Sequence, residues 1–163
     1  MAKEVTDMRY AKRIIAVGLI AGLVLSACAT SAAPAATKRT VYMSAVEYKG
    51  STEVAKEAFP AAPVPAGGGY VLKPPTDGKW ETSTYRWEPG TIVVYQGDEV
   101  ELQIWGVNGA DHPGRIEGYD KTFNVRRGQL TTISFTASRA GVFRILCDVH
   151  NPSMTGTLVV LAR

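Results

Sequence analysis

The chain has 163 residues, of which 45% are hydrophobic and 20% charged, a composition that suits one globular domain with a substantial core. Its formal net charge is +3, but residues 1–27 hold four of the 18 basic and two of the 15 acidic residues, so the rest of the chain has a net charge of only +1. No basic surface is left to bind nucleic acid, and we expect no nucleic-acid partner.

Residues 1–27 are predicted to be an export signal. Basic side chains precede the apolar run Ile14–Leu25, which small residues follow. This run is shorter than the roughly 20 residues that a membrane-spanning helix needs. The sequence Leu25–Cys28 resembles the lipobox of bacterial lipoproteins, which implies a lipid on Cys28 that anchors the protein on the extracytoplasmic (periplasmic) side of a membrane. The alternative is an ordinary secretory signal, cut within the alanine-rich stretch that ends at Ala36.

The segment after the signal is predicted to be irregular before it becomes a folded domain. Residues 28–40 are small and alanine-rich, which is typical of a flexible tether. Residues 41–84 are expected to hold one strand, Val41–Tyr48, and a short helix, Ser51–Phe59, that stops at a proline. The turn-rich residues 61–79 are expected to form a surface insertion, for which the sequence indicates no function.

The folded domain is expected at 41–163, with its core formed by residues 85–163. Short β-rich runs follow one another with turn residues between them, for example at 96–98, and two further strands are predicted at 141–147 and 155–162. This pattern, with almost no helix, predicts an all-β fold, a Greek-key β-sandwich. Alternation with polar neighbours predicts the following core residues: Val100, Leu102, Ile104, Leu130, Ile133 and Phe135.

One short stretch near the C-terminal end, CDVHNPSM, brings together Cys147, His150 and Met154, which are all soft or borderline metal ligands. The stretch connects two predicted strands, so it forms a loop at one end of the sandwich, where the sheets hold functional loops in place. The alternative is a buried core cysteine, a surface histidine and a core methionine that are neighbours by chance.

The rest of the chain favours a metal site over chance. Two cysteines in an exported protein usually form a disulfide, but an acylated Cys28 could not pair with Cys147, and a metal ion protects a lone thiol in an oxidising compartment. The only other histidine, His112, follows the predicted strand that ends at Trp105, in a loop that can lie at the same end of the sandwich. We expect Asn108 or Asn151 to connect these two loops.

Residues from about 87 to 163 resemble a cupredoxin, the blue-copper electron-transfer fold. PGTIVVYQGDEVELQI resembles the strand–turn–strand of that family, and AGVFRILCDVHNPSMTGTLVV resembles its closing segment. The resemblance implies one copper ion with His112, Cys147 and His150 as strong ligands and Met154 as the axial ligand. It also implies a one-electron carrier, not an enzyme, that works between extracytoplasmic redox proteins of the cytochrome or oxidase type.

Departures from the family pattern leave alternatives open. HPGRIEGYDKTFNV is similar to the copper domains of cytochrome oxidase subunit II and nitrous oxide reductase, but their two-copper centre uses two loop cysteines and this loop has one. Nitrosocyanin has a red copper site with a carboxylate ligand, and Asp111 and Glu117 lie near His112 in the sequence. A red-copper site with small-ligand chemistry is therefore one alternative function, and a copper carrier or chaperone for an oxidase is another.

Overall fold

A computed structural model describes residues 35–163 of the chain. The predicted signal at 1–27 and the predicted lipid-bearing Cys28 lie outside the described residues. Within residues 35–163 no helix is long and apolar enough to cross a membrane.

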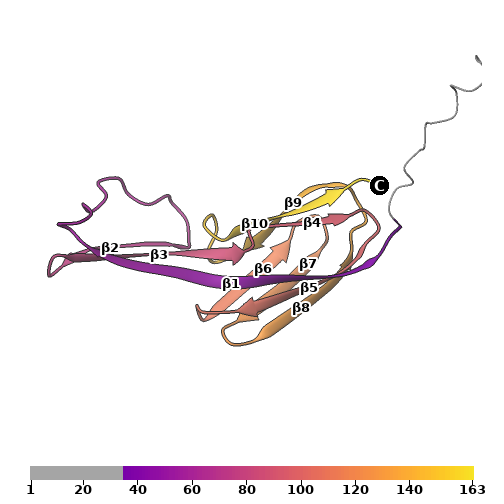
Figure 1. Ribbon diagram of the computed structural model, residues 1–163, viewed down its shortest axis with the longest axis horizontal. Helices are drawn as coiled ribbons and strands as arrows, with labels where there is room; N and C mark the ends of the chain where they lie inside the picture. The colour runs from indigo at the N-terminus through magenta and orange to yellow at the C-terminus, as the bar shows by residue number, and fades with distance from the viewer. Residues whose placement is uncertain (1–34) are drawn as a thin grey trace, which may run out of the picture. The chain divides into compact units, whose positions relative to one another are not determined.

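The described residues form two five-stranded sheets that pack around a common core (Figure 1). The strand order is β2-β3-β1-β5-β8 in the first sheet and β4-β10-β9-β6-β7 in the second, and residues 35–163 contain no helix. The predicted all-β sandwich is thereby confirmed. The strands are β1 (Lys38–Glu53), β2 (Tyr70–Thr76), β3 (Lys79–Glu88), β4 (Thr91–Tyr95), β5 (Glu99–Gly106), β6 (Asp111–Ile116), β7 (Lys121–Arg126), β8 (Leu130–Thr136), β9 (Gly141–Cys147) and β10 (Thr155–Leu161).

Side-chain alternation decides which residues of each strand enter the core. On β5 the apolar residues at 100, 102 and 104 are buried, as predicted. On β8 Ile133 and Phe135 are buried, but the predicted core residue Leu130 is 53% exposed. The prediction for Leu130 was wrong because it lies an odd number of residues from Ile133, and a strand turns such positions to the opposite face.

The N-terminal part of the domain contains more strand than the sequence predicts. β1 begins at Lys38, inside the predicted tether 28–40, and pairs in parallel with β5 and antiparallel with β3. The predicted helix Ser51–Phe59 is absent, because β1 continues to Glu53, whose register partner is Lys79 on β3. The predicted insertion contains β2 and the start of β3, which form a hairpin at the edge of the first sheet (Figure 1).

A buried carboxylate joins both ends of the described chain at the start of β5. Asp98 is fully buried and accepts hydrogen bonds from the main-chain N–H groups of Thr37 and Tyr95, each at 3.0 Å. It also pairs with the guanidinium groups of Arg39 and Arg163. Burial opposes ionisation of this carboxyl, but the two N–H donors and Arg39 outweigh it and hold its pKa well below the ordinary value.

Candidate metal centre

His112 reaches the interior because it lies on a strand. The sequence placed it in a loop, but it is the second residue of β6, which pairs with both β7 and β9. Along β6 exposure alternates, so that His112 is fully buried and Asp111 before it is exposed. The alternation therefore directs the imidazole of His112 inward.

Three potential ligand atoms come together at this end of the sandwich. His112 Nδ1 lies 3.2 Å from His150 Nδ1, and His150 Nδ1 lies 3.4 Å from Cys147 Sγ. The three ligand atoms are all within 4.8 Å of one another, and no carboxylate joins them among the residues that the structure describes. The structure thus brings together three of the four predicted ligands, which come from two distant parts of the sequence.

A main-chain carbonyl selects the tautomer of His112. Its Nε2 lies 3.0 Å from the carbonyl oxygen of Asn108. Since a carbonyl oxygen can only accept, Nε2 carries the proton and Nδ1 presents its lone pair to the cluster. Partners of this kind orient histidine ligands in metal sites, so His112 is prepared to bind a metal through Nδ1.

Cys147 ends β9, and His150 lies three residues later within the turn that leads to β10. Cys147 is the last residue of β9 and is fully buried, and it is a free thiol. Burial raises the pKa of the Cys147 thiol. Burial, with a contribution from His112, lowers the pKa of His150, so that its imidazole is neutral and offers a lone pair. A bound cation would reverse the preference of Cys147 and stabilise its thiolate.

Met154 closes the β9–β10 loop, which we define as residues 148–154. Its side chain is fully buried within the core. Its N–H donates to the carbonyl oxygen of His150 at 2.7 Å, and its own carbonyl accepts from Cys147 N–H at 3.1 Å. The main chain of Met154 is therefore tied to both of the predicted ligands in this part of the chain.

Asp111 and Glu117, the two possible carboxylate ligands of a red-copper site, form ion pairs with other residues. Glu117 accepts from the guanidinium of Arg144 at 2.6 Å and 3.1 Å. Asp111 lies 3.8 Å from Arg126 on the surface. Both carboxylates already have cationic partners outside the cluster of His112, Cys147 and His150.

Sequence reasoning missed the residues that surround the cluster. Tyr85 on β3 stacks on the ring of His150, with centroids 3.8 Å apart and planes 7° apart. Trp87, also on β3, is buried, with its ring centroid 6.3 Å from that of His112. No local sequence signal indicates either contact, because β3 lies in the opposite sheet.

The predicted asparagine connection between the two loops does not occur. The side chain of Asn108 accepts from Glu47 N–H at 2.7 Å and donates to Glu47 O at 2.9 Å, so it binds the His112 segment to β1. The side chain of Asn151 accepts from Thr155 within its own turn at 3.3 Å. Neither side chain bridges the two ligand segments by these bonds.

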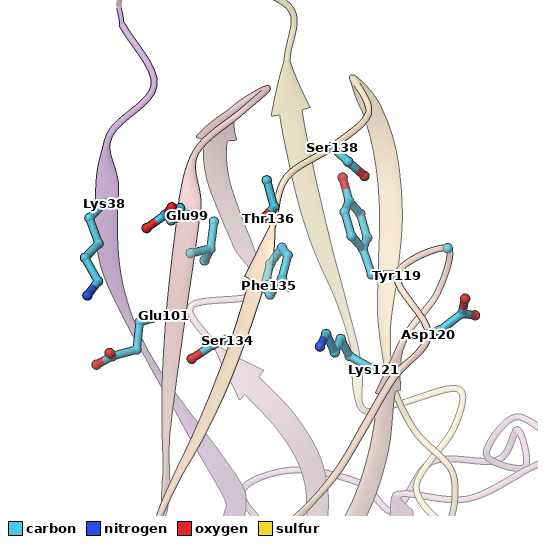
Figure 2. A pocket seen from close by; sticks show the side chains of 12 residues that line it. Lys38, Glu99, Glu101, Tyr119, Asp120, Lys121, Ser134, Phe135, Thr136 and Ser138 are labelled. Atoms are coloured by element: carbon cyan, nitrogen blue, oxygen red, sulfur yellow. The ribbon is translucent and has the colours of Figure 1, made fainter.

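A groove of about 710 Å³, whose lining residues Figure 2 shows, lies at the end of the sandwich opposite the cluster. It is lined by Tyr119 and Phe135, with Lys38, Glu99 and other charged residues at its rim. His112 is near the start of β6, whereas Tyr119 lies in the turn that follows its end at Ile116, so the strand rise from residue 112 to residue 116 separates the two sites by about 13 Å. The groove therefore takes no part in the cluster of His112, Cys147 and His150.

The donor set fits copper. One thiol sulfur and two imidazole nitrogens are the strong ligands of type 1 copper sites, in which a thioether is the weak axial ligand. The absence of a carboxylate from the cluster, within the described residues, disfavours magnesium and calcium, which prefer oxygen ligands. The residues that would hold the ion are His112, Cys147 and His150, and the Met154 side chain is buried in the same core cluster as Cys147.

Part of the chain is similar in sequence to a subunit of cytochrome c oxidase. No known family profile matches. Cytochrome c oxidase subunit 2 of Thermus thermophilus is 30% identical over 80 residues, which cover 47% of this chain and 58% of the relative. The same subunit from strain ATCC 27634 of that species is also 30% identical over 80 residues, with 47% of the relative covered. The chain thus spans about half the length of the curated relatives it matches.

Solved structures that align with this fold include copper proteins whose sequence identity to the chain is low. A multicopper oxidase, mgLAC, aligns with 78% of this chain and 40% of its own at 16% identity, with a TM-score of 0.49. A copper nitrite reductase from Nitrosomonas europaea aligns with 77% of this chain and 42% of its own, also at 16% identity and a TM-score of 0.49. On its strand order, its two sheets and its sequence match, the described domain is a cupredoxin-like β-sandwich.

Proposed function

We propose that the chain is a mononuclear copper protein that carries single electrons between extracytoplasmic redox partners. The observation that carries this proposal is the convergence of His112, Cys147 and His150 ligand atoms within 4.8 Å. Copper in such a site supplies a one-electron redox couple. The fourth ligand in the proposal is the Met154 thioether, which would bind the ion more weakly than the other three.

The protein's own contribution is a fixed set of donors. His112 is held on a strand between two neighbours, and Cys147 ends another strand of the same sheet. The carbonyl of Asn108 fixes one imidazole and the ring of Tyr85 fixes the other. Because these groups are preorganised, little rearrangement accompanies a change of charge at the site, which keeps the barrier to electron transfer low.

His150 marks the proposed docking face for partners. Its side chain is half-buried, whereas His112 and Cys147 are fully buried. Val149, which precedes it, is 54% exposed and places an apolar side chain on the same surface. We expect redox proteins of the cytochrome or oxidase type to dock here, and we expect a lipid on Cys28 to hold the domain at the membrane surface.

Electron self-exchange separates the shuttle from the copper carrier. In a mixture of oxidised and reduced copper-loaded protein, we expect exchange broadening of the NMR signals of residues near His150, because the preorganised ligands favour rapid transfer. The control is incubation with an apo copper-binding peptide, which should not remove the metal on the same timescale. Slow self-exchange together with ready loss of copper to the peptide would favour the carrier and overturn the shuttle.

A further inference from the structure

Three consecutive glycines, Gly67–Gly69, lie directly on the main chain of the β9–β10 loop. The N–H of Gly68 donates to the carbonyl oxygen of Asn151 at 2.7 Å. A Cβ added to Gly68 would lie only 2.2 Å from the carbonyl oxygen of Val149. Since Gly68 does not have a positive φ, close approach of the two backbones is the reason that glycine is needed here. The predicted insertion therefore touches the loop that holds His150.

A buried hydroxyl joins this glycine segment to β3. Ser153 in the β9–β10 loop is 3% exposed, and its Oγ lies 2.8 Å from the carbonyl oxygen of Gly69 and 2.7 Å from that of Tyr85. The single hydroxyl proton of Ser153 is shared between these two carbonyl oxygens, and the Ser153 oxygen lies 3.1 Å from the hydroxyl of Thr84. One buried serine thus connects the loop with two segments that precede it by more than 65 residues.

Tyr85 covers His150 from the same side. Its ring is parallel to the imidazole to within 7° at a centroid distance of 3.8 Å. Rotation of the His150 imidazole out of the cluster would require this stack to break.

We propose that Gly67–Gly69 and Tyr85 form a clamp that holds His150 in place and so closes the copper to small exogenous anions. The glycines fix the main chain of the β9–β10 loop and Tyr85 fixes the imidazole that this loop carries. This inference rests on the proposed copper site and makes the clamp its specificity determinant, because a His150 imidazole held in place would not swing aside to give its position to azide or a similar anion. Tyr85 is a positioning residue in this scheme.

Azide titration of the copper-loaded full chain, followed by visible absorption and EPR, tests the clamp. Gly68→Ala should push the loop away and Tyr85→Leu should remove the stack, and each should tighten azide binding. We expect a change of about 10–100-fold, taking as the scale the effect that loss of an outer partner has on the affinity of a metal site. Two matched controls should bind azide as the unmodified chain does. Tyr85→Phe keeps the ring, and Gly50→Ala adds a Cβ with nothing closer than 3.7 Å. Azide binding that is the same in all five proteins would overturn the clamp.

A copper-free measurement distinguishes failure of the clamp from failure of the metal site. The amide of Met154 donates to the carbonyl oxygen of His150, and its hydrogen exchange reports opening of the β9–β10 loop. In the apo protein we expect faster exchange at Met154 in Gly68→Ala and Tyr85→Leu than in Gly50→Ala. Faster exchange without copper binding would contradict the proposed function and leave the clamp's hold on the loop standing. Unchanged exchange in both variants would overturn the clamp itself.

Discussion

Replacing Cys147 with serine is expected to abolish the intense visible absorption of the copper-loaded protein. The band requires charge transfer from a thiolate to copper. A serine hydroxyl is a hard ligand and cannot take the place of the soft thiolate on this ion. Loss of a residue that only orients a metal ligand lowers metal affinity by about 10–100-fold. Cys147→Ser removes a ligand itself, so copper affinity should fall by more than this. Absorption spectroscopy and copper retention after dialysis measure both effects.

The chain offers a matched control for this substitution. Cys28→Ser removes the only other cysteine and, on the proposed lipidation, should release the protein from the membrane fraction without changing the visible band. The volume of the buried site is nearly preserved in Cys147→Ser, so circular dichroism should report an intact β-sandwich. A band that survives in Cys147→Ser, or disappears in Cys28→Ser, would contradict ligation by Cys147.

The second large effect is expected from Asp98→Asn at the other end of the sandwich. The amide keeps the shape of the carboxylate but has no charge to pair with Arg39 and Arg163. Its NH2 group is a hydrogen-bond donor and would face N–H groups that are donors as well. Loss of one partner of a buried ion pair costs about 3–5 kcal/mol, and the partial exposure of Arg39 reduces this to about 2–4 kcal/mol. Urea unfolding measures the change, with Glu99→Gln, an exposed neighbour, as the control near zero.

The pH dependence of stability identifies the charge of Asp98 as the cause. Its pKa in the folded protein lies below the ordinary value of 3.8, so the folded state binds the proton less tightly than the unfolded state. The contribution to stability is therefore complete above about pH 4 and is lost as the pH falls through the folded pKa. We expect the stability difference between the unmodified chain and Asp98→Asn to shrink on acidification from about pH 6 to about pH 2. A difference that is constant over this range would assign the effect to packing.

The C-terminal half of the fold could be predicted because its signals are local. Alternation in β5 reports burial directly, since neighbouring side chains on a strand point to opposite faces. The same rule, applied strictly, would have placed Leu130 outside, because its parity differs from that of Ile133. The hairpin of β2 and β3 escaped prediction because its prolines and glycines are typical of loops, whereas pairing with β1 satisfies its backbone.

Part of the candidate site could also be predicted. Residues that form a local sequence pattern were found, whereas residues that reach the site from distant parts of the sequence were missed. The spacing of Cys147, His150 and Met154 is a local pattern, and His112 was found because the chain has only two histidines. Tyr85 and Gly67–Gly69 could not be found in this way, because their contacts with the β9–β10 loop depend on how the two sheets face each other. A run of three glycines indicates close backbone approach without indicating the partner.

X-ray absorption at the copper K-edge of the copper-loaded protein tests most directly whether two histidines and one cysteine share a single ion. We expect one copper per chain, with two imidazole nitrogens and one short bond to sulfur around it, because the potential ligand atoms of His112, Cys147 and His150 lie within 4.8 Å of one another. A copper ion surrounded only by nitrogen and oxygen, with no short sulfur bond, would contradict ligation by Cys147 and with it the proposed electron carrier.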